Sequence, residues 1–179
     1  MFIAKVFSIF FVCLLAACGN SVSQPANLNQ TQQKEFSLTM ERGDCWRFCP
    51  VYKLTIQPDG KVLFEGIQDT ETKGKVESIL DKEKLTQIIS EIEKADFFSL
   101  KDSYTSASDN CPSWAIDAPT VILYINLNGE EKKITHSSGC HEVYNPNESQ
   151  KIFPQQLFKL ENKIDEIVET KRWIGERKY

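Results

Sequence analysis

Hydrophobic and polar residues alternate along two short runs that a turn signal separates. From Tyr52 to Gln57 every second residue is aromatic or aliphatic, and residues 61–65 resume the alternation after Pro58-Asp59-Gly60. A period of two is typical of half-buried strands, and a glycine-containing turn between two such runs predicts a β-hairpin. Residues 73–79 predict a further strand.

A second hairpin is predicted around Asn128-Gly129, the strongest short hairpin signal. A β-branched and aromatic run at residues 120–127 precedes this turn, and residues 131–135 follow it. Aligning the two turns superposes Leu54 and Ile56 on Leu123 and Ile125. A duplicated hairpin–helix unit is one interpretation, and chance similarity between two alternating hairpins is the other.

Two amphipathic helices follow the hairpins. Asp81 is the predicted N-cap of a helix to about Ala95, and Leu80 and Leu85 have the spacing of a hydrophobic staple. Its apolar stripe contains Leu85, Ile88, Ile89, Ile92 and Ala95. The second helix opens at Pro154, and its stripe contains Leu157, Leu160, Ile164, Ile167 and Val168. The predicted fold is α+β: an antiparallel sheet of two hairpins plus extra strands, with the two helices on one face.

Residues 1–17 have the order of a secretory signal: Lys5, an apolar run from Val6 to Leu14, then small residues. The run is shorter than the ~17–20 residues that span a bilayer. Leu15-Ala16-Ala17-Cys18 resembles the bacterial lipobox, which implies that the chain is cut before Cys18 and that this cysteine carries diacylglycerol and palmitate-type acyl chains. The alternative is an ordinary signal peptide with an incidental cysteine.

Residues 18–34 are polar and aperiodic, so after the lipidated cysteine they predict a flexible tether, with one domain at residues 35–179. Residue 19 is Gly rather than Asp, which in enteric lipoproteins favours the outer membrane. The expected location is the bacterial cell envelope, anchored by lipid and facing the periplasm.

Composition excludes several classes of protein. The 179 residues are 41% hydrophobic and 26% charged, which excludes a disordered tail, a collagen-like repeat and a polytopic membrane protein. The net charge is −4, and Lys and Arg are scattered rather than clustered. A nucleic-acid partner is therefore not expected.

The six cysteines have three different expected fates. Cys13 leaves with the signal and Cys18 carries lipid, so Cys45, Cys49, Cys111 and Cys140 remain. An even number in an oxidising envelope predicts disulfides, with three connectivities. Cys111 and Cys140 both lie beyond the open end of the second hairpin, so we expect Cys45–Cys49 and Cys111–Cys140, with structural roles and without metal or cofactor.

Chemistry at Cys45 and Cys49 is the alternative. Cys-x-x-x-Cys-Pro resembles the copper loop of Sco-type chaperones, which implies a third ligand such as His136 or His141. That loop leads into a helix, whereas Pro50 here leads into a strand. A short ring is also compatible with a labile redox disulfide. A zinc site of four cysteines matches the usual paired spacing poorly.

Residues 45–60, from Cys45-Trp46-Arg47-Phe48-Cys49-Pro50 to Asp59-Gly60, resemble the opening motif of a family of bacterial envelope lipoproteins, Cys-x-Gly-x-Cys-Pro-x-Tyr-x-Leu-x-Ile-x-x-Asp-Gly. The resemblance covers residues 36–174. Arg47 replaces the family's usual glycine between the cysteines, so the resemblance does not imply an identical loop geometry. The family is one of unknown function, and the resemblance implies a single domain and a lipid anchor.

No coherent catalytic set is visible. Residues 136–142 contain both histidines but lack the His-Glu-x-x-His and Gly-x-Ser-x-Gly spacings, and they predict a loop that leaves the hairpin. Asp109, Asp117 and Glu142 lack a calcium-loop pattern and predict a solvated acidic loop.

Aromatic residues near the cysteines suggest a binding role instead. Trp46 and Phe48 flank Arg47, and Trp114 lies on a neighbouring loop. They either pack over the sheet edge or form a recognition surface for an envelope protein partner. The function we expect is a non-enzymatic binding or structural module.

Overall fold

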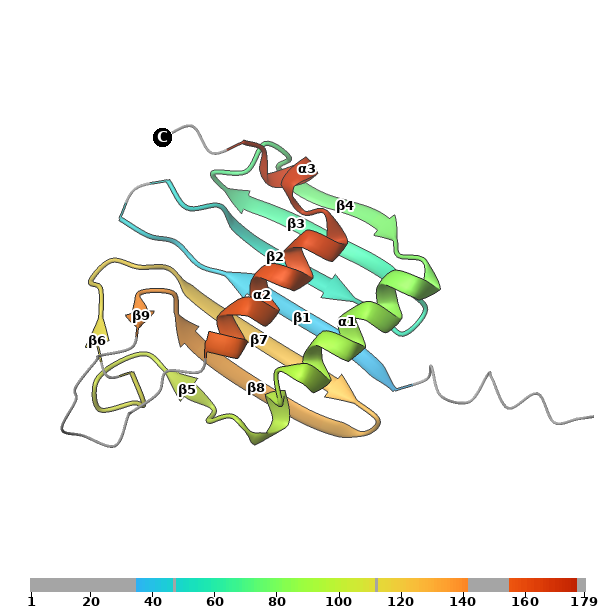
Figure 1. Ribbon diagram of the computed structural model, residues 1–179. Helices are drawn as coiled ribbons and strands as arrows, with labels where there is room; N and C mark the ends of the chain where they lie inside the picture. Colours follow the sequence, from blue (N-terminus) through green and yellow to red (C-terminus); the bar gives the residue numbers. More distant parts are fainter. Residues whose placement is uncertain (1–34, 47, 112, 142–154, 177–179) are drawn as a thin grey trace, which may run out of the picture.

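The computed structural model describes residues 35–46, 48–111, 113–141 and 155–176, which form an α+β fold with a seven-stranded sheet (Figure 1). The elements are, in chain order, β1 (Phe36–Arg42), β2 (Val51–Ile56), β3 (Lys61–Gln68), β4 (Gly74–Ile79), α1 (Lys82–Lys94), the 3₁₀ turn η1 (Phe97–Ser99), β5 (Ser103–Tyr104), β6 (Ser113–Trp114), β7 (Thr120–Leu127), β8 (Glu130–Ser137), β9 (Cys140–His141), α2 (Gln155–Val168) and α3 (Lys171–Ile174).

The sheet has the strand order β4-β3-β2-β1-β7-β8-β5. Both predicted hairpins are present, and every pairing in this sheet is antiparallel except that of β5 with β8. The sheet is therefore mixed rather than purely antiparallel. Its central strand, β1, is not among the strands predicted from the sequence, and it joins the two hairpins by pairing with β2 and β7.

Both hairpin turns depend on glycine. Asn128 and Gly129 have φ of 55° and 82°, the two consecutive left-handed residues that a type I′ turn requires. Gly60 has φ of 84°, and a Cβ at this position would lie 2.7 Å from the carbonyl oxygen of Leu80. A side chain at Gly60 would therefore strain the turn and push against the chain that enters α1.

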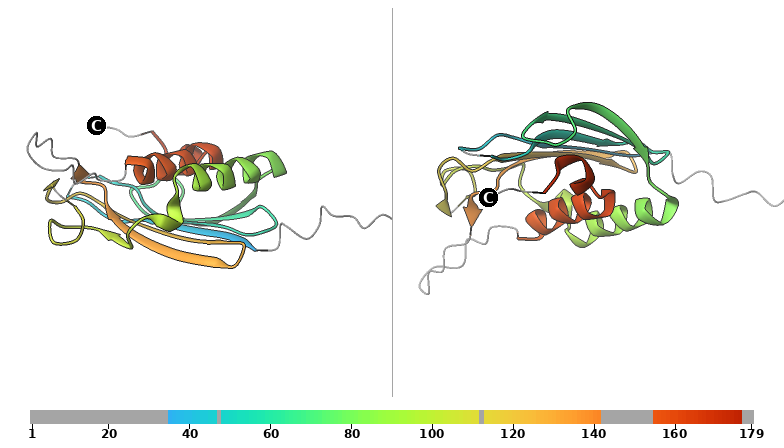
Figure 2. Two further views of the ribbon diagram at one scale, coloured as in Figure 1. Left: turned by 60° about the horizontal axis from the view of Figure 1, so that its bottom comes forward. Right: turned by 90° about the horizontal axis from the view of Figure 1, so that it is seen from above.

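Figure 2 shows α1 and α2 side by side over one face of the sheet. Asp81 caps α1 as predicted, because its carboxylate accepts a hydrogen bond of 2.7 Å from the N–H of Lys84. Alternate residues of β1, β2, β3 and β7 are buried together with the inward stripes of the helices. The helical members of this core are Leu85, Ile88, Ile92, Leu157, Leu160 and Ile164.

The opposite face of the sheet carries charges that alternate in sign across neighbouring strands. Lys53 lies 2.7 Å from Glu41, and Lys75 lies 3.9 Å from Glu65. Opposite charges on adjacent strands stabilise the pairing modestly. None of the helices in the described part of the chain is long and apolar enough to cross a membrane.

The two hairpins are not copies related by a rotation. Leu54 and Leu123 both pair with Met40 of β1, so β2 and β7 run in the same direction with the same face inward. However, β3 and β8 lie on opposite sides of this pair. If β2 is superposed on β7 with the same direction and the same inward face, β3 falls on β1 rather than on β8. The sequence similarity of the two hairpins therefore reflects the alternation of hydrophobic and polar residues that both share.

Candidate functional site

The loop between β1 and β2 is a small ring closed by a disulfide. Cys45 is bonded to Cys49, with Cα atoms 5.6 Å apart, as expected from the sequence. The ring displays two aromatic side chains, because Trp46 is 77% exposed and Phe48 is 78% exposed. These residues do not pack over the sheet edge, so that interpretation is wrong for both. Arg47 lies outside the described residues.

Neighbouring segments hold the ring in place. The N–H of Gly43 donates to the carbonyl of Thr120 (2.7 Å), and that of Trp46 donates to the carbonyl of Asp117 (3.2 Å). The carboxylate of Asp44 accepts from the N–H of Cys45 (2.8 Å) and from the side chain of Gln68 at the end of β3 (3.2 Å). The ring is thus attached to the segment before β7 and to β3.

These attachments bring two further exposed apolar residues to the same end of the sheet. Ile116 precedes Asp117 and is 81% exposed, and Ile67 precedes Gln68 and is 59% exposed. We call Trp46, Phe48, Ile67 and Ile116 the apolar end. Large apolar side chains exposed together in this way are a typical feature of interaction surfaces.

The second disulfide, Cys111–Cys140, also has the predicted pairing, and both residues are buried. It joins Cys111, which lies two residues before β6, to Cys140 of β9, and Cys140 also pairs with Trp114 in the β6–β9 ladder. Gly139 allows the segment after β6 to lie close to the chain before β9, because a Cβ at residue 139 would lie 2.8 Å from the carbonyl oxygen of Ala115 and 2.6 Å from the Cβ of Ala118. The backbone of Trp114 is thereby placed in β6, while its side chain lies outside what the structure describes.

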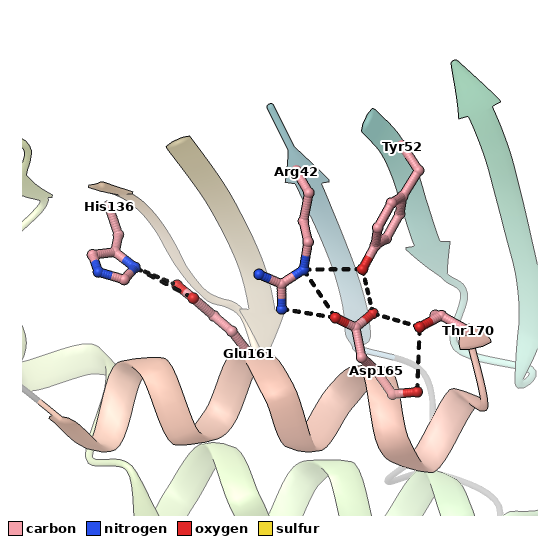
Figure 3. A network of polar contacts seen from close by, with 6 residues as sticks. All are labelled: Arg42, Tyr52, His136, Glu161, Asp165 and Thr170. Atoms are coloured by element: carbon pink, nitrogen blue, oxygen red, sulfur yellow. Dashed lines mark hydrogen bonds and ion pairs between the residues drawn. The ribbon is translucent and has the colours of Figure 1, made fainter. Parts of the chain in front are cut away.

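Beneath the ring, the first residue pair of the β1–β2 ladder meets the end of α2 in a polar cluster (Figure 3). Asp165 of α2 accepts hydrogen bonds from Arg42 Nε (2.9 Å), Tyr52 Oη (2.6 Å) and Thr170 Oγ1 (2.9 Å). Arg42 Nη2 lies 2.7 Å from the same carboxylate. The cluster therefore connects the base of the ring to the helical layer.

Charge and burial set the protonation of this cluster. Burial and the neighbouring Asp165 carboxylate raise the pKa of Tyr52 well above its ordinary value, so the phenol stays protonated and donates. Burial by itself lowers the pKa of Arg42, but the charges of Asp165, Tyr52 and Glu161 together with the hydrogen bond to Asp165 outweigh it, so the net shift of this pKa is upward. The phenol of Tyr52 therefore stays neutral and the guanidinium of Arg42 stays charged.

One turn earlier on α2, Glu161 forms a second buried contact with the sheet. Its carboxylate oxygens lie 3.1 and 3.3 Å from Nδ1 of His136 on β8, and both side chains are buried. Figure 3 shows Glu161 and Asp165 pointing from α2 toward the strands. Sequence reasoning missed Arg42, Tyr52, Glu161 and Asp165. The available signal was a carboxylate at residue 161, inside the stripe that contains Leu157, Leu160 and Ile164.

The segment predicted as a loop at residues 136–142 is largely strand. β8 continues to Ser137 and β9 contains Cys140 and His141, because the disulfide and the pairing with β6 draw this segment back to the fold. His136 turns inward to Glu161 rather than toward the surface. Among the described residues, no three His, Cys, Asp or Glu side chains form a group that could hold a metal ion.

Asp109 is occupied by local contacts. Its carboxylate accepts hydrogen bonds from the hydroxyls of Ser103 and Thr105, which lower its pKa. This geometry closes the loop after β5 on itself. Glu142, which was considered with Asp109, lies outside the described residues, as does Cys18.

A family model described as Domain of unknown function (DUF6438) matches residues 36–168. The chain belongs to this family. The matched part of the DUF6438 protein runs from the start of β1 to the end of α2, so it includes the ring, both disulfides and the polar cluster. A search of curated proteins found no match.

Proposed function

We propose that this DUF6438 protein is a lipid-anchored binding module of the bacterial envelope. It is held at the outer membrane, faces the periplasm and has no enzymatic activity. It docks a protein partner through the apolar end. The observation that carries the proposal is the exposure of Trp46 and Phe48 on a disulfide-closed ring. Aromatic residues presented on a preorganised loop lose little conformational freedom on binding and are frequent hot spots.

The direction of β1 supports a partner that binds at the end of the sheet opposite the anchor. The chain enters β1 at Phe36, and the ring begins after Arg42 at the other end of the sheet (Figure 1). A strand of this length spans about 20 Å. If Cys18 carries the lipid and residues 19–34 form the tether, the apolar end faces the periplasm rather than the membrane that holds the anchor.

The charges around the apolar end favour protein over lipid. Asp44, Asp69 and Asp117 are exposed next to the ring or next to its attachment points. Acidic side chains are repelled by anionic lipid headgroups, which attract basic segments instead. The surface is complementary to an apolar protein patch bordered by neutral or basic residues.

Site-directed crosslinking in intact cells tests the proposal. A photoreactive phenylalanine analogue replaces Phe48 in the full-length chain, and adducts are resolved by gel and mass spectrometry. We expect a discrete protein adduct that Trp46→Ala reduces at least tenfold, because truncating a hot spot costs about 2 kcal/mol or more.

Ile79→Ala is the matched control, because Ile79 is also strongly exposed but lies at the end of β4, beside the start of β3 at Lys61. It should leave the adduct unchanged. Adducts with lipid alone, or protein adducts equally reduced by both variants, would show that the apolar end does not dock a protein partner.

A further inference from the structure

The two disulfides differ in accessibility. Cys45 and Cys49 are half-buried, and their ring neighbours Trp46 and Phe48 are exposed, whereas Cys111 is 0% exposed and Cys140 is 5% exposed. Exchange begins when a thiolate reaches one sulfur of a disulfide, so access limits its rate. We propose that Cys45–Cys49 is a thiol–disulfide exchange site whose substrate is a dithiol, and that Cys111–Cys140 is a structural bond that does not exchange in the folded protein.

Opening the ring leaves the surrounding structure intact. The ladder between β1 and β2 starts at the pair Arg42 and Tyr52, and the N–H of Gly43 is hydrogen-bonded to the carbonyl of Thr120. These contacts hold the chain on both sides of the ring without the disulfide. The bond also closes a loop with a sequence separation of only 4, and short loops restrict the unfolded chain least. The native fold therefore tolerates the reduced form.

Opening Cys111–Cys140 has the opposite effect. Both cysteines belong to the hydrophobic core, and the bond connects residues with a sequence separation of 29. Its loss would place two thiols in the core and release the β6–β9 pair, whose described ladder consists of only two residue pairs, Ser113 with His141 and Trp114 with Cys140. Reduction of this bond is therefore coupled to opening of the structure, which makes it slow and unfavourable under native conditions.

The dithiol supplies the two electrons and two protons that reduction of the ring disulfide requires. One thiolate of the dithiol attacks the sulfur of Cys45 or Cys49, the ring bond breaks, and the departing sulfur takes a proton. The second thiol of the dithiol then attacks its own sulfur in the mixed disulfide and releases the remaining cysteine as a thiol. The ring gains two electrons and two protons, the dithiol becomes a disulfide, and the reverse sequence reoxidises the ring.

The full chain, extracted from membranes in detergent, is incubated with dithiothreitol under native conditions and quenched by alkylation. Peptide mass spectrometry then measures modification at each cysteine. We expect Cys45 and Cys49 to be modified at least tenfold faster than Cys111 and Cys140, while circular dichroism stays native. In mixtures of reduced and oxidised dithiothreitol, the ring disulfide should be half-reduced at a potential at least about 30 mV less negative than the potential at which Cys111–Cys140 is half-reduced. This difference is the equivalent of a tenfold change in equilibrium constant.

Cys45→Ser/Cys49→Ser should remove the fast phase and retain the native spectrum. The matched double variant Cys111→Ser/Cys140→Ser removes the slow phase, and the first variant remains informative even if the second does not fold. Simultaneous opening of both bonds, earlier opening of Cys111–Cys140, or resistance of the ring until the protein unfolds would overturn the proposal.

Acid-quenched alkylation of growing cells provides the second measurement. We expect a reduced fraction at Cys45 and Cys49 beside fully oxidised Cys111 and Cys140, and complete oxidation of both bonds under all growth conditions would contradict the proposal. The exchange and docking proposals share the ring, but their failures are distinguishable. Fast exchange at Cys45 and Cys49 without a crosslink at position 48 would contradict docking alone, and a crosslink with slow exchange would contradict exchange alone.

Discussion

At the scale of single residues, the side chains that meet in the polar cluster come from positions that look unrelated in the sequence. Tyr52 belongs to the alternating pattern of a strand, and its hydroxyl donates a hydrogen bond to Asp165, which lies 113 residues later in the chain. Burial makes such a hydrogen bond matter, because a buried acceptor that loses its donor keeps its full desolvation cost.

Tyr52→Phe should lower the free energy of unfolding at pH 7 by about 1.5–3 kcal/mol, the cost of a lost hydrogen bond to a charged group. The folded-state pKa of Tyr52 is raised above the ordinary value near 10, so this residue stabilises the fold fully below pH 10 and progressively less above it. Urea unfolding between pH 8 and 11.5 should therefore show a shallower alkaline decline in Tyr52→Phe than in the wild type.

Thr170→Val is the control for this measurement. It removes a hydroxyl that also donates to Asp165 but adds or removes no titratable group. It should lower stability at every pH and leave the alkaline slope unchanged. Identical slopes for the wild type and Tyr52→Phe would mean that Tyr52 ionises normally in the folded protein.

At the scale of elements, α2 is attached to the sheet by polar contacts as well as by its apolar stripe. Glu161 reaches β8 through His136, and Asp165 reaches β1 and β2 through Arg42 and Tyr52. Because hydrogen bonds require particular partners, these contacts determine the position of α2 along the strands more narrowly than apolar packing does.

Replacing Glu161 tests this attachment. Glu161→Ala should reduce the free energy of unfolding by about 3–5 kcal/mol, since it removes one member of a fully buried polar pair. Glu166→Ala is the matched control on the same helix, because Glu166 is exposed and pairs only with Lys163 among the contacts described, so it should change stability by less than about 0.5 kcal/mol. Equal effects in urea unfolding would exclude a role of Glu161 in holding α2.

At the scale of the whole molecule, the sheet has two structurally different ends. The start of β1 receives the chain from the proposed anchor, and the far end carries the ring and both disulfides (Figure 1). This polarity arises because β2 and β7 run in the same direction on either side of β1, which places the segments before both strands at one end.

The anchor has its own test in Cys18→Ser. We expect the variant to lose incorporation of labelled palmitate and to move from the membrane fraction to the periplasmic fraction, because the acyl chains provide most of the membrane affinity. Cys13→Ser should remain labelled and membrane-bound, since Cys13 precedes the cleavage site. Labelling that persists in Cys18→Ser would place the lipid elsewhere or exclude it.

The sequence by itself determined the local structure. The alternation at residues 52–57 and 120–127, the Asn128-Gly129 turn and the Asp81 cap all appear as predicted, because each depends on interactions between residues close in the chain. The disulfide pairing followed from the hairpin geometry for the same reason. Signals that are local can be read from one sequence.

Only the tertiary structure decided which side chains meet and which face solvent. Nothing in the spacing of Trp46 and Phe48 distinguishes packing over the sheet edge from display, and the attachment of the ring to Thr120, Asp117 and Gln68 resolves it. Likewise, the contact of His136 with Glu161 and that of Arg42 with Asp165 require the helix to cross the sheet at one position. These features depend on pairings between distant segments, whose free energy comes from burial and is not encoded in any single stretch of the chain.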